Sequence, residues 1–237
     1  MEIIARYPSD IPQAYARYYA LLADTFAALM PAANEQTILE AGCGRGQLTL
    51  PLLARLPKKT HMICVDSSKG PYAGWLQELS SKISRFGLEA RVRLISGDVR
   101  KMKVTTGSVD CIVSNELICD LMTRDSLNKA LREFHRVLKP GGFTIHGEWS
   151  SWEDRISNKL TARHSPAWDP DQLFAILGQN GFHHIKAHYF DTTIRFDYRA
   201  ALFELRSWTA RRSAEKRILT GHTSLSLPCE HIITARK

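Results

Sequence analysis

Apolar residues in this chain fall into short runs, separated by stretches in which apolar residues recur every three or four positions. A short run bounded by turn residues is typical of a buried strand, and the three-to-four spacing is typical of an amphipathic helix. Strands that alternate with helices of about 10–15 residues predict an α/β chain with a doubly wound, mostly parallel sheet and helices on both faces. The predicted strands cover residues 37–41, 61–66, 91–96, 109–114 and 143–148, and the helices between them lie near 48–56, 72–86 and 124–138.

Further elements are expected on either side of this pattern. No repeat and no long Gly/Pro/Ser linker divides the 237 residues, so we expect a single domain. It would consist of a lid helix within 1–30, a core at 31–150, a loop at 150–168 and a basic helical insertion at 195–217. The additional predicted elements are a helix over 11–30, a helix over 169–180, a strand near 183–190, a helix near 197–217 and a strand near 230–235.

A glycine-rich turn follows the first predicted strand. Glu40 precedes glycines at positions 42, 44 and 46, and the turn opens a helix. Glycine lets a ligand reach the backbone with no Cβ in the way, and a helix N-terminus behind the turn offers N–H groups to an anion. No Gly-Lys-Ser/Thr follows, which excludes the phosphate loop of nucleoside triphosphatases. Gln47 stands where a dinucleotide-binding turn has its third glycine, which disfavours a nicotinamide site.

Four further segments accompany this turn in chain order. Asp66 ends the second predicted strand, Asp98 and Val99 follow the third, Asn115 follows the fourth, and residues 134–142 precede the fifth. Together with the glycine motif, E/D-x-G-x-G-x-G, this order resembles the class I S-adenosylmethionine (SAM)-dependent methyltransferases. The resemblance covers residues 37–148. It implies a Rossmann-like fold, SAM as the cofactor, and an enzyme that transfers the methyl group of SAM.

The resemblance also implies which residues contact SAM. Asp66 would accept the ribose hydroxyls, and Asp98 with the Val99 backbone would meet the adenine. The glycine turn would receive the amino-acid end of the cofactor, with Glu40 behind it. Without the resemblance, Glu40 and Asp66 could each be a helix-capping acid. The full set of cofactor-binding residues implied is Tyr19, Glu40, Gly42, Cys43, Gly44, Gly46, Asp66, Ser67, Asp98, Val99 and Asn115.

The motifs leave the methyl acceptor open. Methyl transfer depends mainly on alignment of the reacting atoms, and a general base is needed only for a protonated nucleophile, so we assign no catalytic residue. The acceptor atom is an O, N, S or C atom of a small molecule or a protein. Residues 138–142 resemble the branch of the family that acts on small molecules, whereas a basic helix and two acids favour a protein.

Three residues are candidate substrate contacts. Glu116 and Asp125 lie nine residues apart after the fourth predicted strand. Protein arginine methyltransferases place two acids at this spacing to grip a guanidinium group, and the chain resembles them in part. Alternatively, Asp125 caps the helix that follows. Trp149, after the fifth strand, offers an aromatic face that would attract a sulfonium or fill the core.

The net charge of +8 is concentrated near the C-terminus. Segment 195–217 carries a net +4 of it. Its apolar residues follow helical spacing, so one face should pack and the other should be basic. The basic face is either a solvated surface or a docking surface for an acidic protein or RNA.

Cysteine spacing and hydropathy narrow the class of protein. None of the five cysteines forms a CxxC pair, so we expect buried thiols and no metal site. There is no run of about 18 apolar residues and no signal-peptide pattern, so we expect a cytoplasmic protein without a membrane span. Two other classes stay open: a nicotinamide-dependent oxidoreductase, and a SAM-binding partner protein without activity.

Overall fold

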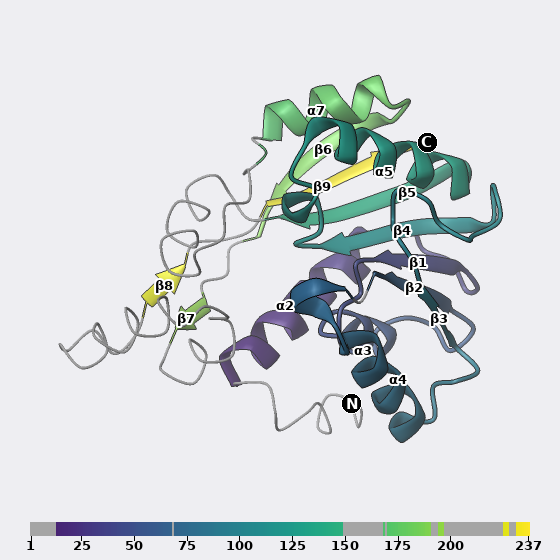
Figure 1. The fold of residues 1–237 in the computed structure, drawn as a ribbon, viewed down its shortest axis with the longest axis vertical. Coiled ribbons are helices and arrows are strands. Elements are labelled where there is room, and N and C mark those ends of the chain that lie inside the picture. Colours follow the sequence, from purple (N-terminus) through teal and green to yellow (C-terminus); the bar gives the residue numbers. More distant parts are fainter. Residues whose placement is uncertain are drawn as a thin grey trace.

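A seven-stranded sheet forms the centre of the computed structural model (Figure 1). The structure describes residues 13–67, 69–148, 168, 170–190, 194–196, 225–227 and 231–237. The strand order is β3-β2-β1-β4-β5-β9-β6; β1 to β5 run parallel, and β9 is antiparallel to both of its neighbours. This confirms the predicted mostly parallel sheet. The strands are β1 (Thr37–Ala41), β2 (His61–Asp66), β3 (Val92–Ser96), β4 (Val109–Asn115), β5 (Leu138–Glu148), β6 (His183–Tyr189) and β9 (His231–Arg236).

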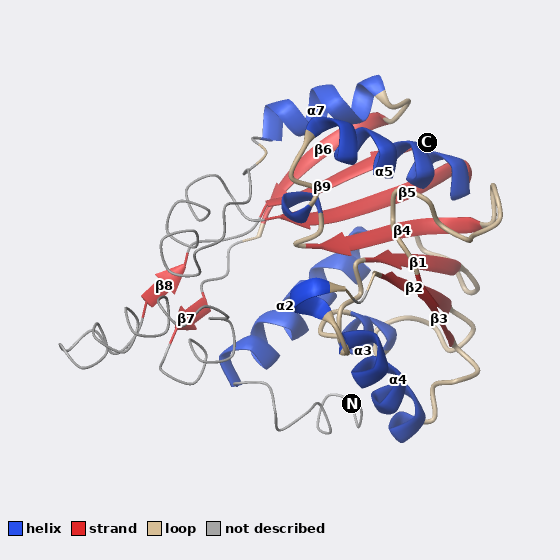
Figure 2. Ribbon diagram, viewed as in Figure 1, coloured by secondary structure: helices blue, strands red, loops and turns tan. Residues whose placement is uncertain are grey.

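Helices cover both faces of this sheet (Figure 2). Leu22 and Leu52 belong to the apolar cluster under α2, α3 and α4, and Phe134 belongs to the cluster under α5 and α7. Along β1, Ile38 faces the first cluster and Leu39 the second, which is why the strand is apolar at consecutive positions. The helices are α2 (Gln13–Leu29), α3 (Thr49–Leu53), α4 (Trp75–Phe86), α5 (Arg124–Val137) and α7 (Pro170–Gln179), with 3₁₀ turns η1 (Gly70–Tyr72) and η2 (Ile118–Asp120).

Two elements differ most in length from their predictions, and α4 also begins at Trp75 instead of residue 72. Strand β5 begins at Leu138 instead of residue 143, and its register against β4 shifts between Val109 and Cys111. The shift accommodates the Pro-Gly-Gly residues that suggested a break. Helix α3 ends at Leu53 instead of reaching residue 56, because Pro57 disfavours helical backbone before it. The helix expected directly behind the glycine turn is thus a single short helix that starts three residues after Gly46.

Helix α5 begins with a cap that the sequence interpretation did not assign. Thr123, in extended conformation, accepts a hydrogen bond on Oγ1 from the Ser126 N–H at 3.1 Å. Asp125 lies in the first turn and pairs with Lys129 at 2.6 Å. The alternative in which Asp125 caps this helix is therefore wrong, since Thr123 fills that role.

The C-terminal part is described in pieces. Helix α7 and strands β6 and β9 agree with their predicted ranges. Arg195 and Phe196 belong to a short strand, β7 (Ile194–Phe196), that pairs with β8 (Leu225–Leu227), so the basic segment begins as a strand and not as a helix. The rest of segment 195–217, Trp149 and the loop up to residue 167 lie outside the described residues. None of the helices in the described ranges is long and apolar enough to span a membrane.

Candidate functional site

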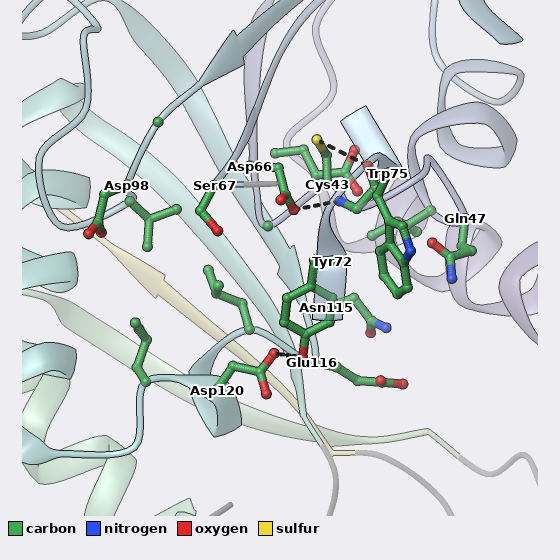
Figure 3. A pocket seen from close by; sticks show the side chains of 18 of the residues that line it. Cys43, Gln47, Asp66, Ser67, Tyr72, Trp75, Asp98, Asn115, Glu116 and Asp120 are labelled. Carbon is green, nitrogen blue, oxygen red and sulfur yellow. Dashed lines mark hydrogen bonds between the residues drawn. The ribbon is translucent and has the colours of Figure 1, made fainter. Parts of the chain in front are cut away.

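A cavity of about 430 Å³ opens where β1, β2 and β4 end (Figure 3). Strand β1 lies between β2 and β4, so the segments that leave these three strands meet at one edge of the sheet. In open parallel sheets, ligands bind at this carboxyl edge, where connections leave toward opposite faces. Ten of the eleven predicted cofactor-binding residues line the cavity, and Gly46 is the exception.

The glycine turn forms one wall of the cavity. Gly42 and Gly44 have φ angles of +72° and +54°, in the left-handed region that favours glycine. A Cβ on Gly42 would lie 2.9 Å from Leu117 Cδ1, and one on Gly44 would lie 3.0 Å from the Trp75 ring. Side chains at positions 42 and 44 would therefore clash with Leu117 and Trp75, two residues that line the cavity. The turn fits a ligand that approaches the backbone closely.

Gly46 supports the turn from behind. Its N–H donates to the Cys43 carbonyl at 2.9 Å, and its φ is +86°. A Cβ here would lie 2.4 Å from Cδ1 of Leu79, a fully buried residue of α4. The third glycine of the motif therefore serves helix packing and does not face the cavity.

Asp66 connects the second strand to the glycine turn. It is buried at the end of β2, and its Oδ2 accepts the Gly44 N–H at 2.9 Å (Figure 3). This bond fixes the carboxylate beside the turn and inside the cavity. The helix-capping alternative does not describe this bond, because Gly44 lies in the turn and not in a helix.

Glu40 lies beneath the turn in an almost fully buried position. Its Oε2 accepts the Thr49 hydroxyl at 2.6 Å. Burial is the main cause that raises the pKa of this carboxyl to about 8, although the Thr49 bond opposes the shift. Glu40 also lines the cavity, so its charge state depends on what the cavity holds.

The raised pKa of Glu40 makes a prediction about the unliganded protein. Because the folded-state pKa lies above the ordinary 4.5, ionisation is penalised in the folded state, and stability falls as the pH rises from about 4.5 to about 8 and then levels off. We expect the thermal midpoint to fall between pH 6 and pH 9, and Glu40→Gln to remove part of that fall. Burial also raises the pKa of Glu148, and ionisation of Glu148 accounts for the part of the fall in thermal midpoint that Glu40→Gln leaves.

Glu133→Gln is the control for this pH series. The Arg136 guanidinium lowers the pKa of Glu133, so that group contributes stability above its ordinary pKa and loses it only in acid. The variant should keep the wild-type slope between pH 6 and pH 9. An unchanged slope in Glu40→Gln would contradict the buried, protonated state assigned to Glu40.

Residues that follow β3 form another wall of the cavity. Arg100 holds Asp98 through its Nε and Nη2 atoms at 2.6–3.1 Å, and its backbone N–H also donates to Asp98 Oδ1. This bonding lowers the pKa of Asp98. Val99 is buried beside it and also lines the cavity. Arg100 itself lines the cavity and was not anticipated from the sequence.

The end of β4 places two polar residues at the cavity. Asn115 Oδ1 is buried and has no hydrogen-bond partner in the described part of the chain. Glu116 has a φ of +52°, a conformation that costs a non-glycine residue about 1–2 kcal/mol, and its N–H donates to the Gly147 carbonyl at 2.9 Å. The chain therefore bends sharply here, and both residues line the cavity.

The structure does not bring Glu116 and Asp125 together at the cavity. Glu116 lines it, whereas Asp125 is exposed on α5, paired with Lys129, and is not among the lining residues. The two-acid clamp implied by the partial likeness to arginine methyltransferases stays a prediction, with Asp125 one residue before the lining residue Ser126. The third candidate contact, Trp149, lies outside the described residues.

Several lining residues were missed by the sequence interpretation. Three of them face the cavity in Figure 3: Tyr72, which precedes α4; Trp75, at the start of α4; and Asp120, in η2. Tyr72 donates a hydrogen bond from its hydroxyl to Asp120 Oδ2 at 2.5 Å. Tyr72 and Asp120 are 48 residues apart in the chain, so periodicity gave no signal for the pair.

The charges around the cavity match a cationic ligand. Its acidic lining residues outnumber Arg100, the cation in the described part of the lining, which is already paired with Asp98. SAM carries a sulfonium and an ammonium against one carboxylate, and it needs a close approach to backbone at its amino-acid end. The glycine turn and the buried Asn115 oxygen therefore fit this cofactor. The acidic residues are Glu40, Asp66, Asp98, Glu116 and Asp120.

Comparison with known proteins gives the same assignment. A family model described as a methyltransferase domain matches residues 38–142, the segment that contains every described cavity-lining residue except Tyr19. Residues 38–142 of this chain are therefore a methyltransferase domain, in agreement with the resemblance to the class I SAM-dependent methyltransferases. The predicted family, Rossmann-like fold and cofactor are thus confirmed.

Two curated methyltransferase-family relatives and one solved structure show the range of the similarity. The malonyl-[acyl-carrier protein] O-methyltransferase of Methylovorus sp. (strain MP688) is 27% identical over 190 residues, which cover 77% of this chain and 62% of the relative. The carboxy-S-adenosyl-L-methionine synthase of Shewanella halifaxensis (strain HAW-EB4) is 27% identical over 135 residues, or 56% of this chain and 53% of the relative. The YcgJ protein of Bacillus subtilis superposes with a TM-score of 0.73 at 16% identity, over 93% of this chain and 98% of that structure.

The chain spans between half and two thirds of the length of these two curated relatives. The two relatives differ from each other in the reaction that their names describe. The likeness to the solved structure concerns the fold. The names of these relatives therefore do not define the particular reaction of this chain.

Proposed function

We propose that this protein transfers the methyl group of SAM to a nucleophilic O, N, S or C atom of an acceptor molecule. The observation that carries the proposal is the cavity at the ends of β1, β2 and β4, where a glycine turn, Asp66 and a largely acidic lining meet. When bound, SAM supplies a methyl group activated by its sulfonium. The chain's own residues bind, orient and shield it.

Each wall of the cavity has a distinct role in this proposal. The Gly42–Gly44 backbone receives the amino-acid end of the cofactor, and Asp66, held by the Gly44 N–H, accepts the ribose hydroxyls. Asp98 and Val99 bound the adenine end. Tyr19 of α2, which is 5% exposed, closes the cavity from the N-terminal helix and supports the lid role proposed for residues 1–30.

The acceptor binds in the part of the cavity whose lining residues are not assigned to the cofactor. Glu116, at the end of β4, remains the candidate substrate contact among the described residues. The malonyl-[acyl-carrier protein] relative transfers to oxygen, and a small molecule or a protein-linked group fits this proposal equally. In-line alignment of acceptor and methyl carbon is the main catalytic demand, so no general base is assigned.

Ligand-dependent thermal stability tests cofactor binding. A ligand at a hundred times its dissociation constant stabilises a protein by about 2.7 kcal/mol, which for this chain length raises the midpoint by roughly 5–10 °C. We expect that shift with SAM and with S-adenosylhomocysteine, and none with NADH. A shift with NADH alone would favour the oxidoreductase, and no shift with the SAM pair in a folded sample would contradict the proposal.

Transfer of labelled methyl from SAM separates an enzyme from a SAM-binding partner protein. Label recovered in a small-molecule or protein fraction of a cell extract, and strongly reduced with Asp66→Ala, supports an enzyme and gives the acceptor class. Binding without any transfer favours the non-catalytic alternative.

We also propose a reducing compartment such as the cytoplasm. Cys43, Cys64, Cys111 and Cys119 are buried free thiols, and disulfides are rare in reducing compartments. Docking of an acidic protein or RNA on segment 195–217 stays a prediction.

A further inference from the structure

One buried carboxylate lies next to the cavity without lining it. Glu148 is the last residue of β5 and is 3% exposed. Its two oxygens accept different backbone N–H groups: Oε1 accepts that of Ile118 at 2.9 Å, and Oε2 that of Cys119 at 3.1 Å. Burying a carboxylate is costly unless it is hydrogen-bonded, and here both oxygens are used to hold one short turn.

That turn carries a wall of the cavity. Turn η2 comprises residues 118–120, and its last residue, Asp120, lines the cavity. Glu116, two residues before this turn, is held as well, because its N–H donates to the carbonyl of Gly147, the residue before Glu148. The end of β5 therefore fixes the whole segment 116–120 through three hydrogen bonds.

Asp120 in turn bridges the cavity. Its Oδ2 accepts the Tyr72 hydroxyl at 2.5 Å, and Tyr72 belongs to η1, in the segment that follows β2 (Figure 3). The ring of Tyr72 packs edge-on against Trp75 at 5.0 Å between ring centroids, and Trp75 covers Gly44. The bridge thus joins the wall after β4 to the wall after β2, on either side of the glycine turn.

From this chain of contacts we infer that Glu148 is a positioning residue for the cofactor cavity: it acts through η2 to hold Asp120 against Tyr72, and this bridge retains the bound cofactor. Glu148 is not among the residues that line the cavity. The inference rests on the proposed function, because it concerns how long SAM stays in its site.

Cofactor release measures this role directly. Protein loaded with tritiated SAM is diluted into excess S-adenosylhomocysteine, and the loss of bound label gives the dissociation rate. Tyr72→Phe removes one hydrogen bond to a carboxylate, so we expect release about tenfold faster. Glu148→Gln keeps a single acceptor oxygen for two N–H groups, so we expect release about fivefold faster.

The double variant decides whether Glu148 acts through the bridge. Residues of one network give non-additive effects, whereas independent residues multiply. With Tyr72→Phe already present, Glu148→Gln should add little, so the double variant should stay near tenfold and not approach about fiftyfold. If Glu148→Gln does not fold, Glu148→Asp, which keeps a carboxyl group but shortens its reach, takes its place under the same prediction.

Glu133→Gln is the matched control. Glu133 also accepts a backbone N–H, that of Met102 at 2.8 Å, and it does not line the cavity. It should lose stability without changing the release rate. Multiplicative effects, or unchanged release in Glu148→Gln, would overturn the positioning role while leaving the proposed function intact. No binding of SAM by the wild type would overturn the proposed function and this inference together.

Discussion

Asp66→Ala should weaken the binding of S-adenosylhomocysteine by about 100-fold to 10,000-fold, because it removes two charge-assisted hydrogen bonds to the ribose, each contributing about 1.5–3 kcal/mol. The side chain also holds the Gly44 N–H at 2.9 Å, so the glycine turn loses its anchor at the same time. Titration calorimetry measures the affinity. Asp66→Asn, which keeps an oxygen for Gly44 but removes the charge, should lose less affinity than the alanine variant.

Asp110→Asn provides the control for this loss. Asp110 accepts the Thr37 N–H at 2.8 Å and pairs with Lys139 at 2.7 Å, near the start of β4 and away from the cavity. Its replacement should leave the affinity within about twofold of the wild type, since distant sites act independently. Equal affinity of Asp66→Ala and the wild type would exclude Asp66 from the ribose site.

Gly46→Ala should destabilise the protein by about 2–5 kcal/mol, the sum of left-handed strain and crowding in the core. The new Cβ would lie 2.4 Å from Leu79 Cδ1, and Leu79 is fully buried, so α4 or the glycine turn has to move. Displacing either one also disturbs the cofactor wall, so affinity for SAM should fall with stability. Urea unfolding and calorimetry measure the two effects.

Gly107→Ala separates the two causes of that loss. Gly107 has a comparable φ of +61°, and a Cβ there would meet nothing within 4 Å. It should cost only the left-handed strain of about 1–2 kcal/mol and leave cofactor affinity unchanged. Equal losses in the two alanine variants would show that Gly46 is needed for its backbone conformation and not for the packing of α4.

The sequence predicted the elements that carry a local signal. Strands such as β1 and β2 are runs of apolar residues bounded by turns, and glycines follow β1 directly, so both the sheet and its cofactor edge could be predicted. The same signal failed for α3, which Pro57 shortens, and for the cap of α5, where Thr123 and not Asp125 meets the Ser126 N–H.

Contacts between distant segments could not be predicted from spacing. The Tyr72–Asp120 bond spans 48 residues, and the bonds of Glu148 to η2 span 29 and 30 residues. In the sequence, Glu148 is simply an acid at the end of an apolar strand. A carboxylate in that position signals either a ligand contact or a buried anchor, and only the fold shows that it holds η2.

Hydrogen–deuterium exchange with and without S-adenosylhomocysteine tests most directly whether the cofactor occupies this cavity. We expect slower exchange in peptides that cover residues 40–48, 98–100 and 115–121, because their backbone lines the cavity, and no change in α7. Protection confined to other segments, or unchanged exchange at saturating ligand, would contradict the assignment of SAM to the edge formed by β1, β2 and β4.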